Sequence, residues 1–228
     1  MTDDLRVQGL VPNFEPYTDL GFSFDQSNTG CGYASPAIFD TTGNNAVVDW
    51  VLVELRSKID PSVVVASRTA LLLRQSKVVD VDGVSALSFK NVSQDEYFVV
   101  VRHRNHLGVM SGNTLVFDAN TPTIDFSDPF TVTFGTDAQN NINGNLAMWS
   151  GNSYHDNDIK YAGLTNDRDP ILVRIGGLIP TAVEFGYYPE DVNMDGFTKY
   201  GGLFNDRDEV LLNIGGQVPT QVKIEQLP

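Results

Sequence analysis

Apolar and polar residues alternate along residues 47–55 (VVDWVLVEL), which places Val48, Trp50 and Leu52 on one face of an extended chain. Turn signals such as Asp82-Gly83 separate this run from further apolar runs, and no long helical period occurs before residue 160. Short strands at this spacing predict a mainly β domain, an antiparallel Ig-like or prealbumin-like sandwich, over residues 46–135. The predicted strands are 47–55, 62–73, 76–81, 85–90, 96–103, 107–109, 114–118 and 122–134.

The segments on either side of this domain have a different pattern. Residues 1–45 are irregular, with several prolines, a Gly/Asn-rich stretch and room for one short strand at 19–25. Residues 136–151 are rich in Gly and Asn and predict a linker. The remaining region, 152–228, is therefore expected to form a second structural part.

The region 152–228 contains a sequence repeat. Residues 152–181 and 191–220 are identical at half of their aligned positions, without a gap, and the longest shared run is Asn-Asp-Arg-Asp. Such self-similarity at a fixed offset indicates a duplicated unit. Each copy predicts an oxygen-rich loop followed by a short helix, because Asn-Asp supplies a cap, apolar residues follow at helical spacing and Gly-Gly ends the run.

The second copy begins with a hexapeptide typical of calcium-binding loops. Residues 191–196 (DVNMDG) place side-chain oxygens at loop positions 1, 3 and 5, and a glycine that permits the sharp turn at position 6. Gly202 stands at position 12, where an acid is usual, so we expect the final carboxylate from the start of the following helix. The competing interpretation is a solvated Asx turn. The candidate Ca²⁺ ligands are Asp191, Asn193, Asp195, Phe197 through its carbonyl, and Asp206, with Asp208 as a second candidate for the final ligand.

The first copy departs from this pattern. Tyr154 stands at position 3, where a ligand oxygen is expected, and Asn157 replaces the glycine of position 6. Several acids remain, so we expect a weaker or differently arranged calcium site. Its candidate ligands are Asn152, Asp156, Asp158, Asp167 and Asp169.

The net charge narrows the range of partners. A formal charge of −14 and a pI near 4.4 argue against a nucleic-acid partner, because phosphate contacts need clustered Lys and Arg. The excess of acid is explained either by a solvated surface or by binding of a hard cation. No apolar run reaches the length of a membrane span, so we expect no membrane-spanning segment.

The sequence carries no recognisable catalytic motif. Cys31 is the only cysteine, which excludes an intramolecular disulfide and a cysteine-rich metal site. His103 and His106 are not spaced as a helical zinc pair, and we expect them to be structural or surface residues. Neither a G-x-S-x-G motif nor a phosphate-binding glycine loop is present. We therefore expect a protein that is not an enzyme.

Three resemblances follow from these motifs. Residues 87–101 (LSFKNVSQDEYFVVV) resemble the hairpin of prealbumin-like or CnaB-type sandwiches, and residues 148–220 resemble the tandem calcium repeats of dockerins, apart from an insertion at 199–204. Together with VDWVLVELR at 48–56 and YFVVVRHRNHLGVM at 97–110, the two K-Y-x-G-x-x-N-D-R-D segments are similar to the C-terminal region of large secreted Bacteroidetes-type surface proteins, of the haemagglutinin- or dockerin-domain kind. This last resemblance implies a secreted, cell-surface location and no particular biochemical activity.

These observations lead to two functional hypotheses. The first is a non-enzymatic extracellular structural module for adhesion, anchoring or self-assembly into a matrix or filament, in which calcium stabilises small repeats that cannot bury enough surface alone. Its partners would be further copies of the chain, other cell-surface proteins or glycans. The alternative is a carbohydrate-binding module of a secreted polysaccharide-degrading protein, in which Trp149, Tyr187 and Tyr188 stack on sugars instead of packing the second region. Residues 1–20 lack a signal-peptide pattern, so the chain either stays inside the cell or is a processed piece of a longer secreted chain, and the resemblance to secreted proteins favours the second alternative.

Overall fold

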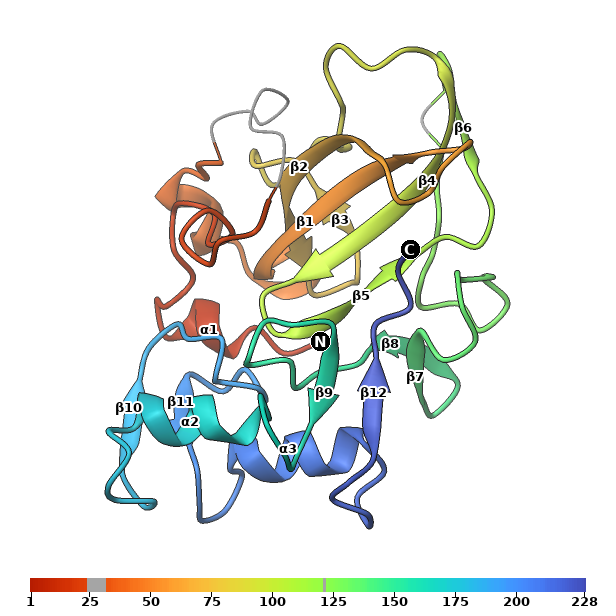
Figure 1. The fold of residues 1–228 in the computed structure, drawn as a ribbon. Helices are drawn as coiled ribbons and strands as arrows, with labels where there is room; N and C mark the ends of the chain where they lie inside the picture. The colour runs from red at the N-terminus through yellow and green to blue at the C-terminus, as the bar shows by residue number, and fades with distance from the viewer. Residues whose placement is uncertain (24–31, 121) are drawn as a thin grey trace. The chain divides into compact units, whose positions relative to one another are not determined.

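Six strands form one sheet in the order β3-β2-β1-β4-β5, with β6 also paired to β4, in the computed structural model, which describes residues 1–23, 32–120 and 122–228 (Figure 1). The pairings of β1 with β2 and β4, of β2 with β3 and of β4 with β6 are antiparallel. The predicted mainly β, antiparallel architecture is therefore confirmed. The strands are β1 (Val47–Ser57), β2 (Val64–Leu73), β3 (Val78–Val79), β4 (Asp95–His103), β5 (His106–Met110) and β6 (Leu115–Phe117).

The chain divides into two compact units, and neither is a continuous segment. The unit that contains the sheet, called here the sheet unit, comprises Met1–His103, Gly108–Ala147 and Gln226–Pro228. The unit that contains the repeats, called here the repeat unit, comprises Arg104–Leu107 and Met148–Glu225. The short turn between β4 and β5 thus belongs with the repeats and not with the sheet. In the described part of the chain, no helix is long and apolar enough to cross a bilayer.

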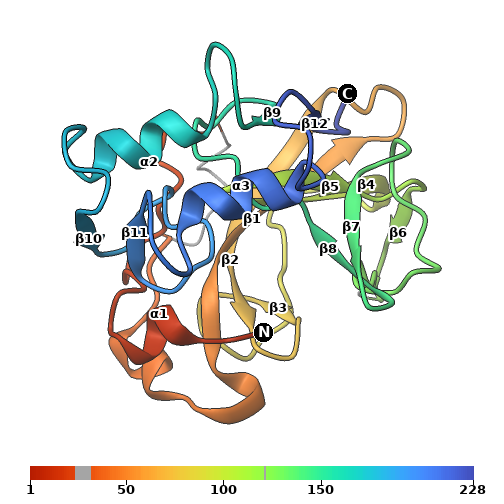
Figure 2. The ribbon, with the colours of Figure 1, turned by 90° about the horizontal axis from the view of Figure 1, so that it is seen from below.

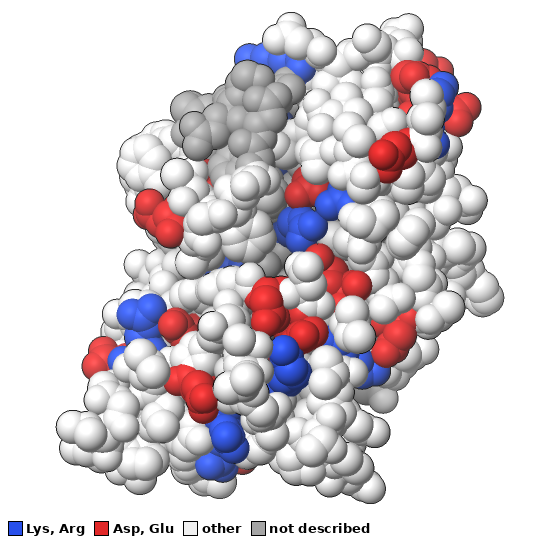
Figure 3. Space-filling model, viewed as in Figure 1, with Lys and Arg blue, Asp and Glu red and all other residues white. Residues whose placement is uncertain are grey.

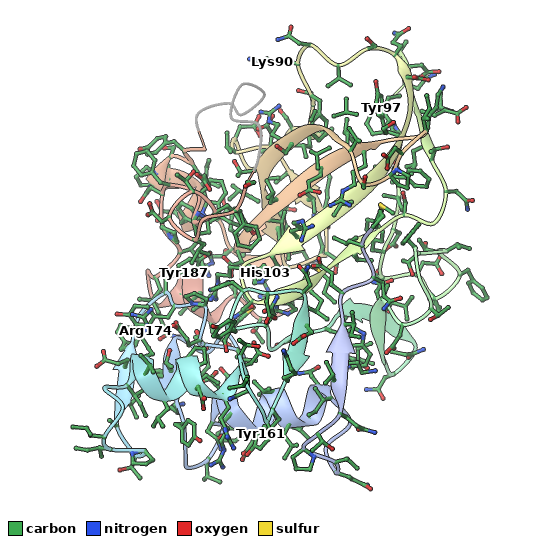
Figure 4. The ribbon with its side chains drawn as sticks, in the orientation of Figure 1. Lys90, Tyr97, His103, Tyr161, Arg174 and Tyr187 are labelled. Atoms are coloured by element: carbon green, nitrogen blue, oxygen red, sulfur yellow. The ribbon has the colours of Figure 1, made fainter. Side chains whose placement is uncertain are left out.

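Strand β1 is buried on both faces, so the alternation expected over residues 47–55 does not separate a core face from an exposed face. Val51, Val53 and Leu55 belong to a cluster on one face, together with Tyr97 of β4, whose ring lies edge-on to that of Phe117 (Figure 4). On the alternate positions Trp50 is fully buried, and its Nε1 donates to the carbonyl of Pro12 at 2.9 Å. The N-terminal segment therefore helps to cover the second face of the sheet.

Several predicted strands are irregular chain in the structure. Residues 85–90 contain no strand, and residues 122–134 contribute only a bridge between Thr133 and Ser111. Leu87, Phe89, Ile124 and Phe126 nevertheless pack on the core of the sheet unit. Their apolar pattern records burial, which loops satisfy as well as strands do.

The flanking segments are also more ordered than the sequence indicates. Within the predicted linker 136–151, β7 (Gln139–Ile142) and β8 (Asn145–Met148) form a two-stranded sheet. In the N-terminal region, short helical segments occur at Asp4–Val7 (α1), Pro36–Asp40 and Gly43–Asn45. Of the short strand expected at 19–25, residues 19–21 form a turn, residues 22 and 23 are irregular, and residues 24 and 25 lie outside the described part, as does Cys31.

The repeat unit consists of two short β-α-β modules. Helices α2 and α3 lie side by side (Figure 2). The first module contains β9 (Asp158–Lys160), α2 (Arg168–Arg174) and β10 (Val183–Phe185), and the second contains β11 (Phe197–Lys199), α3 (Asp206–Asn213) and β12 (Val222–Ile224). Every element of the second module lies at the 39-residue sequence offset from its counterpart, to within one residue at helix ends. Each copy of the sequence repeat therefore contains a loop followed by a short helix, at equivalent positions in the chain.

The core of the repeat unit draws on both modules and on the β4–β5 turn. Ile159, Ile171, Val210 and Ile214 are buried, as are Leu107 from the turn, Trp149 and Val192. Tyr161, labelled in Figure 4, stacks beneath the guanidinium of Arg168 at 5.0 Å. Its counterpart Tyr200 stacks beneath the guanidinium of Arg207 at 5.1 Å. The duplication therefore extends from backbone to side-chain packing.

Candidate functional site

The two loops that precede α2 and α3 share an unusual backbone. His155 and Met194, at the fourth loop position, have φ of 62° and 61°, and Thr165 and Phe204, just before the helices, have φ of 53° and 54°. Residues other than glycine rarely adopt this left-handed backbone conformation. Its recurrence at equivalent positions shows that each copy folds its loop in the same way.

Asp206 closes the second loop from the start of α3. Its Oδ1 accepts backbone hydrogen bonds from Val192 (2.7 Å) and Asn193 (3.2 Å), and its Oδ2 accepts one from Lys199 (2.8 Å). Asp191, at loop position 1, accepts from the amides of Asp195 (3.1 Å) and Gly196 (2.8 Å). Both carboxylates are fully buried.

The first loop is closed in the same manner. Asp167, also fully buried, accepts backbone hydrogen bonds from Tyr154 at 2.9 Å and from Lys160 at 2.7 Å. At position 1, Asn152 accepts from the amide of Asp156 at 3.1 Å, so a neutral amide replaces the carboxylate of the second loop. This loop consequently carries one buried carboxylate where the second carries two.

The buried carboxylates are poorly neutralised. Burial raises the pKa of Asp206 and of Asp167 to about 7 and the pKa of Asp191 to about 6, against 3.8 ordinarily. Asp191 raises the pKa of Asp206 further, while the charge of Arg104 acts on Asp191 in the opposite direction. Within the described part of the chain, no lysine, arginine or histidine forms an ion pair with any of these three carboxylates. A proton or a bound cation would relieve this arrangement.

The remaining loop acids face lysines. Asp195 Oδ2 lies 2.9 Å from the Lys199 ammonium, and in the first loop Asp158 Oδ2 lies 3.0 Å from that of Lys160. Asp156 lies 4.0 Å from the same lysine. On the face shown in Figure 3, acidic and basic side chains form small mixed groups and not one field of negative charge. Because Asp195 is paired with Lys199, calcium binding through Asp195 would displace the Lys199 ammonium.

Asp208 and Asp169 serve the helix starts and do not close the loops. Asn205 accepts from the amide of Asp208 at 3.0 Å and donates to its carboxylate at 2.8 Å, and Asn166 makes the equivalent pair with Asp169. One bond of each pair satisfies a backbone amide in the first turn of the helix, and the other fixes the Asp side chain against the Asn side chain. Of the two candidates for the last ligand of the second loop, the geometry favours Asp206.

A cation in the second loop would need mixed donors. Among the residues that the structure describes, no three His, Cys, Asp or Glu side chains converge as a metal-binding group. Apart from Asp195, the other candidate ligands that the sequence offers in this loop are the side-chain amide of Asn193 and the carbonyl of Phe197. Asn193 Oδ1 already accepts from the amide of Asp195 at 2.9 Å, an arrangement that also occurs in an Asx turn.

The aromatic residues expected to stack on sugars are engaged within the repeat unit. Trp149 is 8% exposed, packs in the core and lies 3.8 Å beneath the Lys223 ammonium. Tyr187 and Tyr188 are covered by Arg104 at 4.3 Å and Arg174 at 4.4 Å, respectively. The packing interpretation therefore explains these three residues.

The β4–β5 turn contributes to both loops, although no sequence pattern predicted a role for it. Asn105 is fully buried, and its Nδ2 donates to the carbonyls of Pro189 (3.0 Å) and Asp191 (2.8 Å). Its own carbonyl accepts from the amides of Gly151 and Asn152, both at 3.0 Å. One residue thus holds the first position of both loops, and nothing in the local sequence marks it.

Comparison with known proteins adds no relative. No protein-family model matches the chain, and neither a curated protein nor a solved structure is significantly similar to it.

Proposed function

We propose that the chain is a non-enzymatic structural module of an extracellular protein and that calcium stabilises its repeat unit. The observation that carries the proposal is the pair Asp191 and Asp206, two fully buried carboxylates in one loop whose pKa values burial raises to about 6 and about 7, even though the charge of Arg104 opposes the shift at Asp191. A divalent cation bound by oxygen ligands would offset the cost of their burial. On this proposal the repeats are a dockerin-like pair attached to a sandwich-like β domain.

The second loop is the stronger candidate site and the first the weaker. The second offers two buried carboxylates, whereas the first offers Asp167 with the neutral Asn152 at position 1. Calcium affinity generally rises with the number of charged ligands. We therefore expect the second loop to bind first.

Thermal unfolding in calcium and in EDTA tests the proposal. An ion bound only by the folded state raises the free energy of unfolding, so calcium should raise the Tm. For a chain of this size, each kcal/mol of added stability corresponds to a rise of about 2–4 °C. Asp206→Asn should abolish most of this calcium-dependent shift, and Asp195→Ala should reduce it. The matched control is Asp208→Asn, which should lower the Tm equally with and without calcium because it removes a negative charge from the first turn of α3 and weakens the hydrogen bond from Asn205 Nδ2. Identical melting curves in calcium and in EDTA would exclude calcium binding.

The extracellular role rests on the resemblance to secreted surface proteins, and self-assembly is its most testable form. Light scattering at high protein concentration, with and without calcium, distinguishes the possibilities. Calcium-dependent growth beyond the monomer supports assembly into a matrix or filament. A strictly monomeric chain under both conditions leaves adhesion or anchoring through another protein.

A further inference from the structure

The end strands of the two modules are exchanged. β10, which ends the first module, pairs with β11 of the second, and β12, which ends the second module, pairs with β9 of the first. Neither end strand pairs with the loop strand of its own module. The exchange is reciprocal, so it relates the modules by an approximate two-fold arrangement.

The two pairings have the same register. Val183 pairs with Lys199 and Phe185 with Phe197, while their counterparts Val222 and Ile224 pair with Lys160 and Asp158. The backbone hydrogen bond just after each strand is also equivalent in the two modules. Gly186 N donates to Gly196 O at 3.1 Å, and Glu225 N donates to Asn157 O at 2.8 Å. Identical registers at both places show that the exchange is a property of the repeat and not an irregularity of one copy.

Each exchanged strand supports the segment that closes the other module's loop. Lys199 in β11 donates to Asp206, and its strand is held by β10, where the rings of Phe185 and Phe197 lie 5.0 Å apart. Lys160 in β9 donates to Asp167, and its strand is held by β12. A three-residue strand has little stability without a neighbour.

We infer that each repeat braces the loop of the other, so that damage to an end strand opens the loop of the opposite repeat and the two loops are energetically coupled. Loosening β12 releases the first loop, and loosening β10 releases the second. Coupling of this kind is reciprocal, so an ion that orders one loop also favours order in the other. Only the part of this inference that concerns ions rests on the calcium function proposed above.

Two proline variants at equivalent positions test the crossing. Glu184→Pro interrupts β10 and Lys223→Pro interrupts β12, because proline cannot donate in a ladder. Hydrogen exchange in EDTA reports on the amides that bind the loop-closing carboxylates: Tyr154 and Lys160 in the first loop, Val192, Asn193 and Lys199 in the second. We expect Glu184→Pro to accelerate exchange in the second loop by about tenfold or more, and Lys223→Pro to do so in the first.

The alternative outcomes contradict the inference. If each proline accelerates exchange only in the loop of its own repeat, the repeats are independent. If both loops accelerate equally, the bracing has no crossed specificity. Should a proline variant fail to fold, Phe185→Ala and Ile224→Ala weaken the same strands more mildly and carry the same crossed expectation.

A calcium titration of the same variants extends the test. If the unmodified chain binds calcium, Glu184→Pro should weaken binding that Asp206→Asn also removes, and Lys223→Pro should weaken binding that Asp167→Asn removes. Absence of calcium binding by the unmodified chain would refute the proposed function, while the exchange result in EDTA would still decide the bracing. The two failures are therefore distinguishable.

Discussion

At the scale of single residues, the loop carboxylates show how burial alters an ordinary side chain. Burial raises the pKa of Asp206 to about 7. Two residues further along, partial desolvation also acts to raise the pKa of the exposed Asp208, but hydrogen bonds from Asn205 and Arg207 outweigh it and hold that pKa below its usual value. Asp206 accepts three backbone amides and still costs the folded state a desolvated charge. Two aspartates of the same helix start therefore have pKa values shifted in opposite directions.

The raised pKa of Asp206 predicts the pH dependence of the calcium-free chain. Between about pH 4 and pH 7 the folded state retains a proton that the unfolded state releases, so this contribution is present at low pH and is lost as the pH rises through about 7. In EDTA, the stability of the chain relative to Asp206→Asn should fall over this window, by at most about 1.4 kcal/mol for each unit of pKa shift. Urea unfolding of both proteins at several pH values provides the measurement.

Calcium should change this slope. Because calcium binds the ionised carboxylate, the stabilisation that it provides should increase as the pH rises through about 7. Parallel pH profiles for the chain and Asp206→Asn in EDTA would show that Asp206 does not titrate in this window.

At the scale of elements, β9 and β11 are equivalent strands with different side chains at the buried position. Ile159 of β9 packs in the core of the repeat unit, whereas Thr198 occupies the corresponding position in β11 and is fully buried. Within the described part of the chain its hydroxyl has no hydrogen-bond partner. The second module therefore contains an uncompensated polar group where the first contains a methyl group.

Replacement of this threonine should stabilise the chain. Thr198→Val keeps the side-chain shape and removes the buried hydroxyl, so the free energy of unfolding should rise by about 1 kcal/mol. The reciprocal control, Ile159→Thr, should lower it by about 1–3 kcal/mol. Both changes can be measured by urea denaturation, and a loss of stability in Thr198→Val would mean that the hydroxyl makes a bond to water or to a ligand.

At the scale of the whole molecule, the repeat unit includes residues that lie far away in the sequence. Asn105 and Leu107 are buried within it, and Asn105 binds the first positions of both loops. A fragment that begins at Met148 lacks these contacts. The boundary at residue 152 that the sequence indicates therefore omits part of the unit's core.

A fragment of residues 148–225 should consequently fail to fold as it does in the full chain, even with calcium. In the full chain, Asn105→Ala should reduce stability by about 1–3 kcal/mol because it leaves the carbonyls of Pro189 and Asp191 without their donor. Asn44→Ala, at an exposed position, is the matched control and should have little effect. Circular dichroism and thermal unfolding provide the readout, and a fragment with native-like cooperative unfolding would contradict the expectation.

The sequence by itself determined the features that depend on neighbouring residues. Short apolar runs between turn signals located β1, β2 and β4, and the duplicated pattern of cap, apolar spacing and Gly-Gly located α2 and α3. Tertiary structure decided which end strand pairs with which loop, that Asp206 and not Asp208 is buried, and that Asn105 joins the two loops. These features depend on which distant segments exclude water from a given side chain, and a single sequence carries no local signal of that.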